Sequence, residues 1–261
     1  MTDSLISAAV SLTKREQPRA VVATALVFHA LSQHYRPQPM RCLLVSCRGG
    51  VWGEATAEGY GYPVLRSTNM RGVRADVSDA AWRQVPTRQA EACTLQTGDI
   101  LVAKSSGSSD LVGKATVFEH PGDDRTYLFS NFLLRLRPNS CIAVPEYLAW
   151  FLRSPQGLSW RYQSQQNAVG LRNLDTNAFL DQLVPRPPTD VQHMIVEYLD
   201  GVQSGTLREP RGDLPEFLPK LHRLVVLQAK VDALKRLQQE TAAELDALLP
   251  SLLDKAFRGE L

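Results

Sequence analysis

The feature that most constrains the fold lies near the C-terminus, in LPKLHRLVVLQAKVDALKRLQQETAAELDALLPSLLDKAF, residues 218–257. With Leu224 at heptad position a, seven of the nine a and d positions are apolar, and Gln238 and Thr241 fill the other two. This repeat is typical of a helix that packs along a second helix, because a lone helix would leave its apolar stripe in water. We therefore predict a helix–helix interface formed by Leu224, Leu227, Val231, Leu234, Leu245, Leu248 and Leu252.

The polar layer and the ends of this helix can also be predicted. Gln238 and Thr241 would set the register or the choice of partner, unless the helix packs differently and they face solvent. Pro219 suits the start of the helix, and Pro250 should end or kink it near Leu249, because proline cannot donate a hydrogen bond to the preceding turn. The thirty-odd residues between the prolines would give a rod of roughly 45 Å.

Upstream of this helix, the chain begins with helical patterns and then changes to short strands. Apolar residues recur at helical spacing over 4–34, and Pro18 marks a break between two helices. From Cys42 on, β-rich runs such as CLLVSC, DILVAK and YLFSNFLLRLR alternate with turn sequences. Helices are predicted among these strands at 146–154 and 175–184. The pattern indicates a mixed α/β (α+β) domain.

Proline and glycine separate this domain from the C-terminal helix. PRPPTD ends the α/β pattern, and TDVQHMIVEYLDGV is predicted to be a short helix capped by Thr189 or Asp190. The chain thus divides into a helical N-terminal extension at 1–40, an α/β domain at 41–188, and a helical region at 189–261 with a Pro/Gly-rich linker at 201–219.

Charge and cysteine content narrow the class of protein. The α/β segment holds 16 Lys/Arg against 13 Asp/Glu, whereas residues 189–261 hold 9 against 12. This permits nucleic-acid binding by the α/β segment without requiring it. No run approaches the roughly 18 apolar residues of a membrane helix. The four cysteines lack CxxC spacing, so we expect a cytoplasmic protein without a disulfide framework.

The stretch GDILVAKSSGSSDLVGKATVF, residues 98–118, invites comparison with a phosphate-binding loop. That loop needs four residues between its glycines and a Ser or Thr after its lysine. Here five residues separate the two glycines, and the lysine is followed by alanine. The β-branched run after it favours a strand over a helix. We therefore predict a hairpin with strands at 99–104 and 114–119 and a loop at 105–113.

Other catalytic patterns do not occur in the sequence. The five histidines are scattered without the spacing of a metal-ligand pair, and there is no GxSxG elbow. We therefore expect no catalytic role, no metal and no directly bound cofactor.

Polar and basic residues between the predicted strands suit contact with DNA. RSTNMRGVR at 66–74 and SQQNAVGLRNL at 164–174 combine arginine with amide side chains. Arginine can pair with guanine and asparagine with adenine, and lysines beside the hairpin can bind phosphate. A solvated loop is the alternative for each. The predicted DNA-binding residues are Arg66, Asn69, Arg71, Lys104, Ser105, Ser106, Lys114, Asn167, Arg172 and Asn173.

Five motifs occur in one order along residues 42–261: GYPVLRSTNM, GDILVAKSSGSSDLVGKATVF, SNFLLRLRPN with PEYLAWFLRS, NLDTNAFLDQLVPRPP with IVEYLD, and LLPSLLDKAFRGEL. Together they resemble the specificity subunit of type I restriction-modification systems. The resemblance implies that the α/β part is a target recognition domain for double-stranded DNA. It also implies that the helical part spaces such domains and docks methyltransferase subunits. S-adenosylmethionine and the base-flipping chemistry then belong to the methyltransferase, and a translocating nuclease subunit can join the complex.

The usual subunit of that family holds two recognition domains and two helical segments, whereas this chain has one of each. Similarity to half-length members implies self-association through the C-terminal helix, which predicts a bipartite target with symmetric halves. One alternative is a coiled-coil assembly protein whose α/β domain binds protein rather than DNA. Another is an enzyme that uses the Gly-rich loop.

Overall fold

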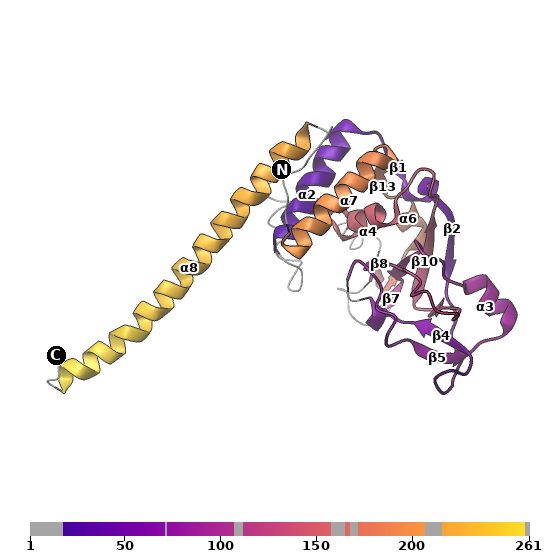
Figure 1. Ribbon diagram of the computed structural model, residues 1–261, viewed down its shortest axis with the longest axis horizontal. Helices are drawn as coiled ribbons and strands as arrows, with labels where there is room; N and C mark the ends of the chain where they lie inside the picture. The colour runs from indigo at the N-terminus through magenta and orange to yellow at the C-terminus, as the bar shows by residue number, and fades with distance from the viewer. Residues whose placement is uncertain are drawn as a thin grey trace.

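The structure is a computed structural model that describes residues 18–70, 72–106, 112–157, 165–167, 172–206 and 216–258. The described elements form an α/β body from which one long helix projects (Figure 1). No helix in these ranges is long and apolar enough to cross a membrane.

A four-stranded antiparallel sheet lies at the centre of the body. Its strands, in order across the sheet, are β2 (Leu44–Gly49), β10 (Leu133–Pro138), β6 (Ile100–Ala103) and β8 (Ala115–Val117). In β6, Ile100 and Val102 belong to one hydrophobic core, and Leu101 and Ala103 belong to another. Because successive side chains point to opposite faces, a strand that is apolar at every position is covered on both sides.

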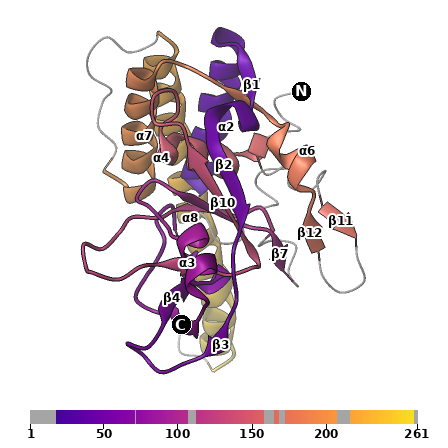
Figure 2. The ribbon, with the colours of Figure 1, turned by 90° about the vertical axis from the view of Figure 1, so that its right-hand side faces the viewer.

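Helices cover one face of this sheet and a second sheet covers the other (Figures 1 and 2). The helices are α2 (Pro18–His34), α4 (Pro145–Arg153) and α7 (Thr189–Ser204). The second sheet has the order β3 (Glu54–Ala55), β5 (Ala81–Gln84), β4 (Tyr62–Leu65) and β9 (Leu128–Phe129), with α3 (Thr87–Cys93) beside it.

Smaller sheets and short helices connect these layers. β1 (Pro37–Pro39) pairs with β13 (Leu183–Pro185), and β11 (Gln165–Asn167), β12 (Arg172–Leu174) and β7 (Ser105–Ser106) form a three-stranded sheet. The short helices are η1 (Met40–Leu43), η2 (Ser67–Asn69) and α6 (Thr176–Leu180).

The hairpin predicted in the Gly-rich stretch is present. β6 and β8 pair antiparallel, with Ile100 opposite Val117 and Val102 opposite Ala115. β8 begins directly after Lys114, so a strand occupies the position where a phosphate-binding loop would be followed by a helix. The loop predicted over 105–113 is wrong at its start, because Ser105 and Ser106 form β7 and pair with β12. Residues 107–111 of the predicted loop lie outside the described residues.

The N-terminal helix is part of the body rather than a separate extension. Val27, Phe28 and Leu31 of α2 are fully buried in the same core as α4 and α7. The ring of Phe28 lies 5.4 Å from that of Tyr147 and 5.3 Å from that of Phe151 in α4. The described part of the predicted extension therefore shares a core with the α/β domain. The helix predicted before Pro18 lies outside the described residues.

Two predicted helices have different ends from those expected. The helix predicted over 175–184 is only α6, because Asp175 caps it by accepting from two backbone N–H groups and β13 follows soon after. The predicted caps of α7 were wrong: its N-cap is Pro188, which has no side-chain donor or acceptor. α7 also continues to Ser204, into the segment predicted as a linker.

The C-terminal helix, α8 (Phe217–Phe257), is longer than predicted. It has 41 residues and contains Pro250 in its interior, which gives a length of about 60 Å at 1.5 Å per residue. Of the two outcomes predicted for Pro250, an end of the helix is therefore wrong, and a kink stays a prediction. A proline costs a helix about 3 kcal/mol by removing one hydrogen bond, and its neighbours in ALLPSLLDKAF are mostly good helix formers. Pro219 lies in the first turn, where its missing N–H has no intrahelical role.

Candidate nucleic-acid interface

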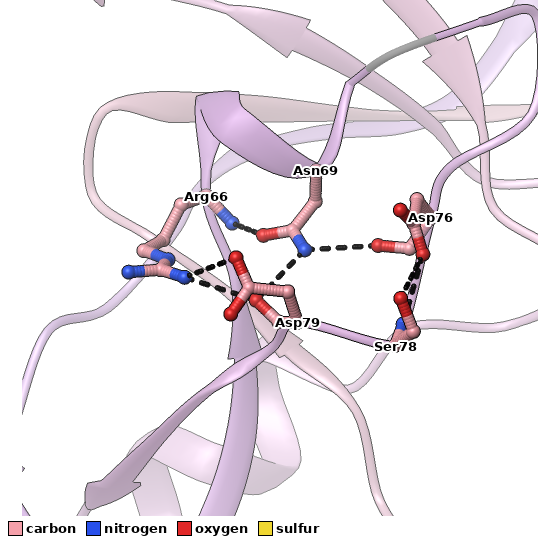
Figure 3. Close-up of polar contacts among 5 residues, drawn as sticks. All are labelled: Arg66, Asn69, Asp76, Ser78 and Asp79. Atoms are coloured by element: carbon pink, nitrogen blue, oxygen red, sulfur yellow. Dashed lines mark hydrogen bonds and ion pairs between the residues drawn. The ribbon is translucent and has the colours of Figure 1, made fainter.

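The loop from Arg66 to Asp79 is organised around a buried amide (Figure 3). Asn69, at the end of η2, is 2% exposed. Its Oδ1 accepts from the backbone N–H of Arg66 at 2.8 Å, and its Nδ2 donates to the carbonyls of Asp76 and Asp79 at 2.9 and 3.0 Å. Asn69 therefore does not line an exposed face, contrary to the prediction, because its amide is used inside the loop.

Arg66 remains at the surface, but its charge already has a partner. Its Nη2 lies 3.1 Å from Oδ2 of Asp79 and donates to the Asp79 carbonyl at 2.9 Å. The two side chains are 34% and 65% exposed, and ion pairs in contact with water contribute little to stability. Arg66 can therefore exchange Asp79 for another anion, such as a phosphate. Arg71, which was predicted beside it, lies outside the described residues.

The second half of the loop is attached to β8. The backbone N–H of Val117 donates to the carbonyl of Val73 at 2.7 Å, and that of Ala75 donates to the carbonyl of Val117 at 2.8 Å. Arg74 forms an exposed ion pair with Glu119. The loop therefore runs alongside the second strand of the hairpin.

The structure brings together six predicted DNA-binding residues from two segments that are far apart in the sequence (Figure 2). They are Lys104, Ser105 and Ser106 in one segment and Asn167, Arg172 and Asn173 in the other. β12 lies between β11 and β7, and Asn173 lies opposite Ser105 across the β12–β7 pair. The predicted Lys114 is close to the same sheet, because its carbonyl accepts from the N–H of Ala103 at 2.9 Å.

A turn that was not predicted to bind DNA lies between these groups. Residues 130–132 join β9 to β10, and the first N–H of the turn donates to the carbonyl of Leu65 at 2.9 Å. At its other end, the carbonyl of Phe132 accepts from the N–H groups of Lys104 and Ser105 at 2.8 and 3.2 Å. Ser and Asn predict a turn here, but no local pattern indicates which segments lie beside it.

We call this continuous arrangement the polar strip. It consists of Arg66, the turn 130–132, Lys104–Ser106, and the strands β12 and β11. By residue type the strip combines basic, hydroxyl and amide residues, which are the groups that contact DNA phosphates and base edges. The backbone pairing places Ser106, Asn167, Arg172 and Asn173 here, and their side chains lie outside those described. Which of its members bind DNA stays a prediction.

Two arginines near the strip serve the core instead. Nε and Nη2 of Arg137 donate to the carboxylate of Asp99 at 2.7 and 2.8 Å, and Asp99 is 1% exposed. The hydrogen bond to Asp99 raises the pKa of Arg137. Arg135 is buried and donates to the carbonyl of Thr94 at 2.9 Å, and burial lowers its pKa. These two positive charges are not available to a ligand.

α8 carries the second candidate interface. Leu218 and Val225 are 0% and 3% exposed in the core that includes α2. Leu227 follows Leu218 by nine positions, and Leu234 follows Val225 by nine positions. Nine residues are two and a half helical turns, so each leucine lies roughly 180° from its buried counterpart, on the opposite side of the helix. The described side chains of the predicted seam are between 37% and 60% exposed. They are Leu224, Leu227, Val231, Leu234, Leu245 and Leu248.

The side chain of Leu252, the last predicted seam residue, lies outside those described. The first turns of α8 thus pack against the body through Leu218 and Val225, and the rest of the helix projects with its predicted seam exposed (Figure 1). Across the ranges that the structure covers, no three His, Cys, Asp or Glu side chains gather in a way that could hold a metal ion.

The chain is similar to known specificity subunits. A family model described as "Type I restriction modification DNA specificity domain" matches residues 53–209. The type I restriction enzyme EcoKI specificity subunit of Escherichia coli (strain K12) is 25% identical over 219 residues, and the StySPI specificity subunit of Salmonella potsdam is 21% identical over 219 residues. Each alignment covers 84% of this chain but only 41% and 42% of the relatives, so the chain spans about two fifths of their length.

A solved structure supports the fold. It is described as the structural basis underlying complex assembly and conformational transition of the type I R-M system, and it matches with a TM-score of 0.50 at 21% identity. The match covers 100% of this chain and 58% of the other. Because the family model covers more than half of its residues, the chain belongs to the type I restriction-modification DNA specificity family.

Proposed function

We propose that this chain is the DNA-recognition subunit of a type I-like restriction-modification complex. It binds a specific double-stranded sequence through the polar strip and directs a partner adenine methyltransferase to that sequence. The observation that carries the proposal is the convergence of Arg66, Lys104 and the β7–β12–β11 sheet, which come from three separate segments. By residue type, a strip of this kind offers hydrogen-bond donors and positive charge to a duplex.

The second part of the proposal concerns assembly. Two copies pair through the exposed seam of α8, since an apolar stripe on a projecting helix is stabilised by a second helix. A two-fold pair presents two identical strips, and the target is then bipartite with symmetric halves. The pairing rests on the exposed seam, whose described side chains are between 37% and 60% exposed.

The chemistry resides in the partners. S-adenosylmethionine binds the methyltransferase subunits, which flip and methylate the adenine, and this chain is non-catalytic and binds no cofactor itself. A translocating nuclease subunit is a further partner where the system also restricts DNA.

DNA binding is tested by filter binding of the full chain, with and without the methyltransferase, at two salt concentrations. Binding that neutralises several phosphates loses affinity with salt at a slope of about 0.9 per phosphate. A mapped modification site should bind more tightly than a scrambled duplex of the same composition. If no duplex binds even with the methyltransferase present, the proposal is refuted. The hypothesis of an assembly protein whose α/β domain binds protein is then favoured.

Self-association is tested by light scattering of three proteins. The wild-type chain should be a dimer, and Leu234→Asp should be a monomer because it places a charge in the middle of the seam. Arg236→Asp is the matched control, because Arg236 lies two positions away and faces outward at heptad position f. A wild-type monomer at micromolar concentration would refute self-pairing.

A further inference from the structure

Phe132 is an exposed aromatic residue in the middle of the polar strip. Its side chain is 46% exposed. Its carbonyl accepts from the N–H groups of Lys104 and Ser105, so its backbone is held beside the start of β7. A single exposed apolar residue is ordinary on a protein surface. Its place in the fold distinguishes this one, because the backbone N–H of Lys104, a residue suited to a phosphate, donates to its carbonyl.

The turn that carries Phe132 is held closely by the surrounding backbone. The N–H of Ser130 donates to the carbonyl of Leu65 at 2.9 Å. On another side, a side chain at Gly50 would collide with the carbonyl oxygens of Phe129 and Ser130. The turn therefore lies directly against the chain at Gly50 and has little room to move. The backbone that carries the Phe132 ring therefore has a defined position on the strip.

We propose that Phe132 makes an apolar contact with the base edges of the recognised duplex and thereby contributes to sequence specificity. This inference rests on the proposed DNA-recognition function. The edges of the bases include apolar groups, among them the methyl group of thymine in the major groove. A ring that covers such a group removes apolar surface from water at a defined base pair. Lys104 beside it reaches the phosphates, which are the same in every sequence.

An apolar base contact and a phosphate contact leave different signatures. Releasing counterions makes a phosphate contact depend on salt, whereas burying a ring releases none. Phe132→Ala should therefore weaken binding to the target duplex about tenfold or more. It should leave the slope of affinity against salt and the affinity for a scrambled duplex unchanged.

The experiment measures both duplexes over a series of salt concentrations with the full chain and the methyltransferase. Leu183→Ala is the matched control, because Leu183 is 56% exposed and lies in β13, away from β7 (Figure 1). Phe132→Leu keeps an apolar side chain and should retain most of the affinity. Thermal unfolding of each variant checks that the fold is intact.

The outcomes separate this inference from the function on which it rests. If the wild type does not distinguish target from scrambled duplex, the proposed function fails. If the wild type distinguishes them and Phe132→Ala does so equally well, only the role of Phe132 is overturned. An equal loss on both duplexes, or a change in the salt slope, would also overturn it, because either result indicates an effect on the phosphate contacts.

Discussion

Replacing Asn69 by alanine should destabilise the protein, although the residue lies in a surface loop. The substitution removes three hydrogen bonds, to the N–H of Arg66 and to the carbonyls of Asp76 and Asp79. Each intramolecular hydrogen bond contributes about 1 kcal/mol net, and leaving a buried group without a partner costs about 1–3 kcal/mol. Because Asn69 is 2% exposed, water cannot simply replace the amide. We expect the free energy of unfolding to fall by about 2–4 kcal/mol.

The assay is equilibrium unfolding in urea, with the midpoint and slope compared among three variants. Ser78→Ala is the control within the same loop, because it removes an exposed hydroxyl that donates to Asp76 and should change stability by less than about 0.5 kcal/mol. Asn69→Asp keeps the acceptor for Arg66 but turns a carboxylate oxygen toward two carbonyls, so its loss should match or exceed that of Asn69→Ala. The midpoint should change while the slope stays constant.

The same substitution decides between two roles for Asn69. If the amide is structural, Asn69→Ala should lower stability, and any loss of DNA affinity should be smaller and follow from disorder of the loop. A base-contacting amide predicts full stability with lost recognition. If Asn69→Ala unfolds at the same urea concentration as the wild type, the buried arrangement in Figure 3 does not hold the loop together and the reasoning is refuted.

Three further predictions follow from the structure. The double substitution of Lys104 and Lys114 by alanine should weaken binding to target and scrambled duplexes alike and reduce the salt slope by about 0.9 per lost phosphate contact, as measured by filter binding. Gly50→Ala should displace the turn that carries Phe132, because the added methyl group collides with the carbonyl oxygens of Phe129 and Ser130. Both the melting temperature and the discrimination between duplexes should fall. Burial raises the pKa of Cys47 to about 11. The thiolate is the reactive form, so the alkylation rate of Cys47 in the folded protein should rise about tenfold per pH unit up to the pKa. The Cys47→Ser variant gives the background rate of the other cysteines. A plateau of the rate near pH 9 would contradict this.

Features that depend on neighbouring residues in the sequence were predictable. The long C-terminal helix and the strand after Lys114 are predicted from short windows of sequence, and the structure contains both elements. Pro250 shows the limit of such reasoning, because a local penalty does not decide where a long helix ends. The extension at 1–40 shows another limit, since the packing of Phe28 against Tyr147 and Phe151 has no signature in the residues around Phe28.

The polar strip could be predicted only in pieces. Residue type predicts Arg66, Lys104 and Arg172 as DNA contacts, but their proximity depends on backbone hydrogen bonds between segments tens of residues apart. Asn69 was misjudged because an amide suits a base and a buried loop equally well, and only the positions of Asp76 and Asp79 distinguish the two.

Asn69 and Phe132 together invert the usual arrangement of side chains, since amides are mostly exposed and aromatic residues mostly covered. The buried position of Asn69 is explained within the chain, because three hydrogen bonds compensate for its removal from water. Phe132 is 46% exposed, and its carbonyl accepts from the N–H groups of Lys104 and Ser105. Departures from local rules tend to occur at functional sites. Exposure alone does not mark a site, because single exposed apolar residues are ordinary. The proposed base contact rests on the place of Phe132 beside Lys104, and Phe132→Ala tests it.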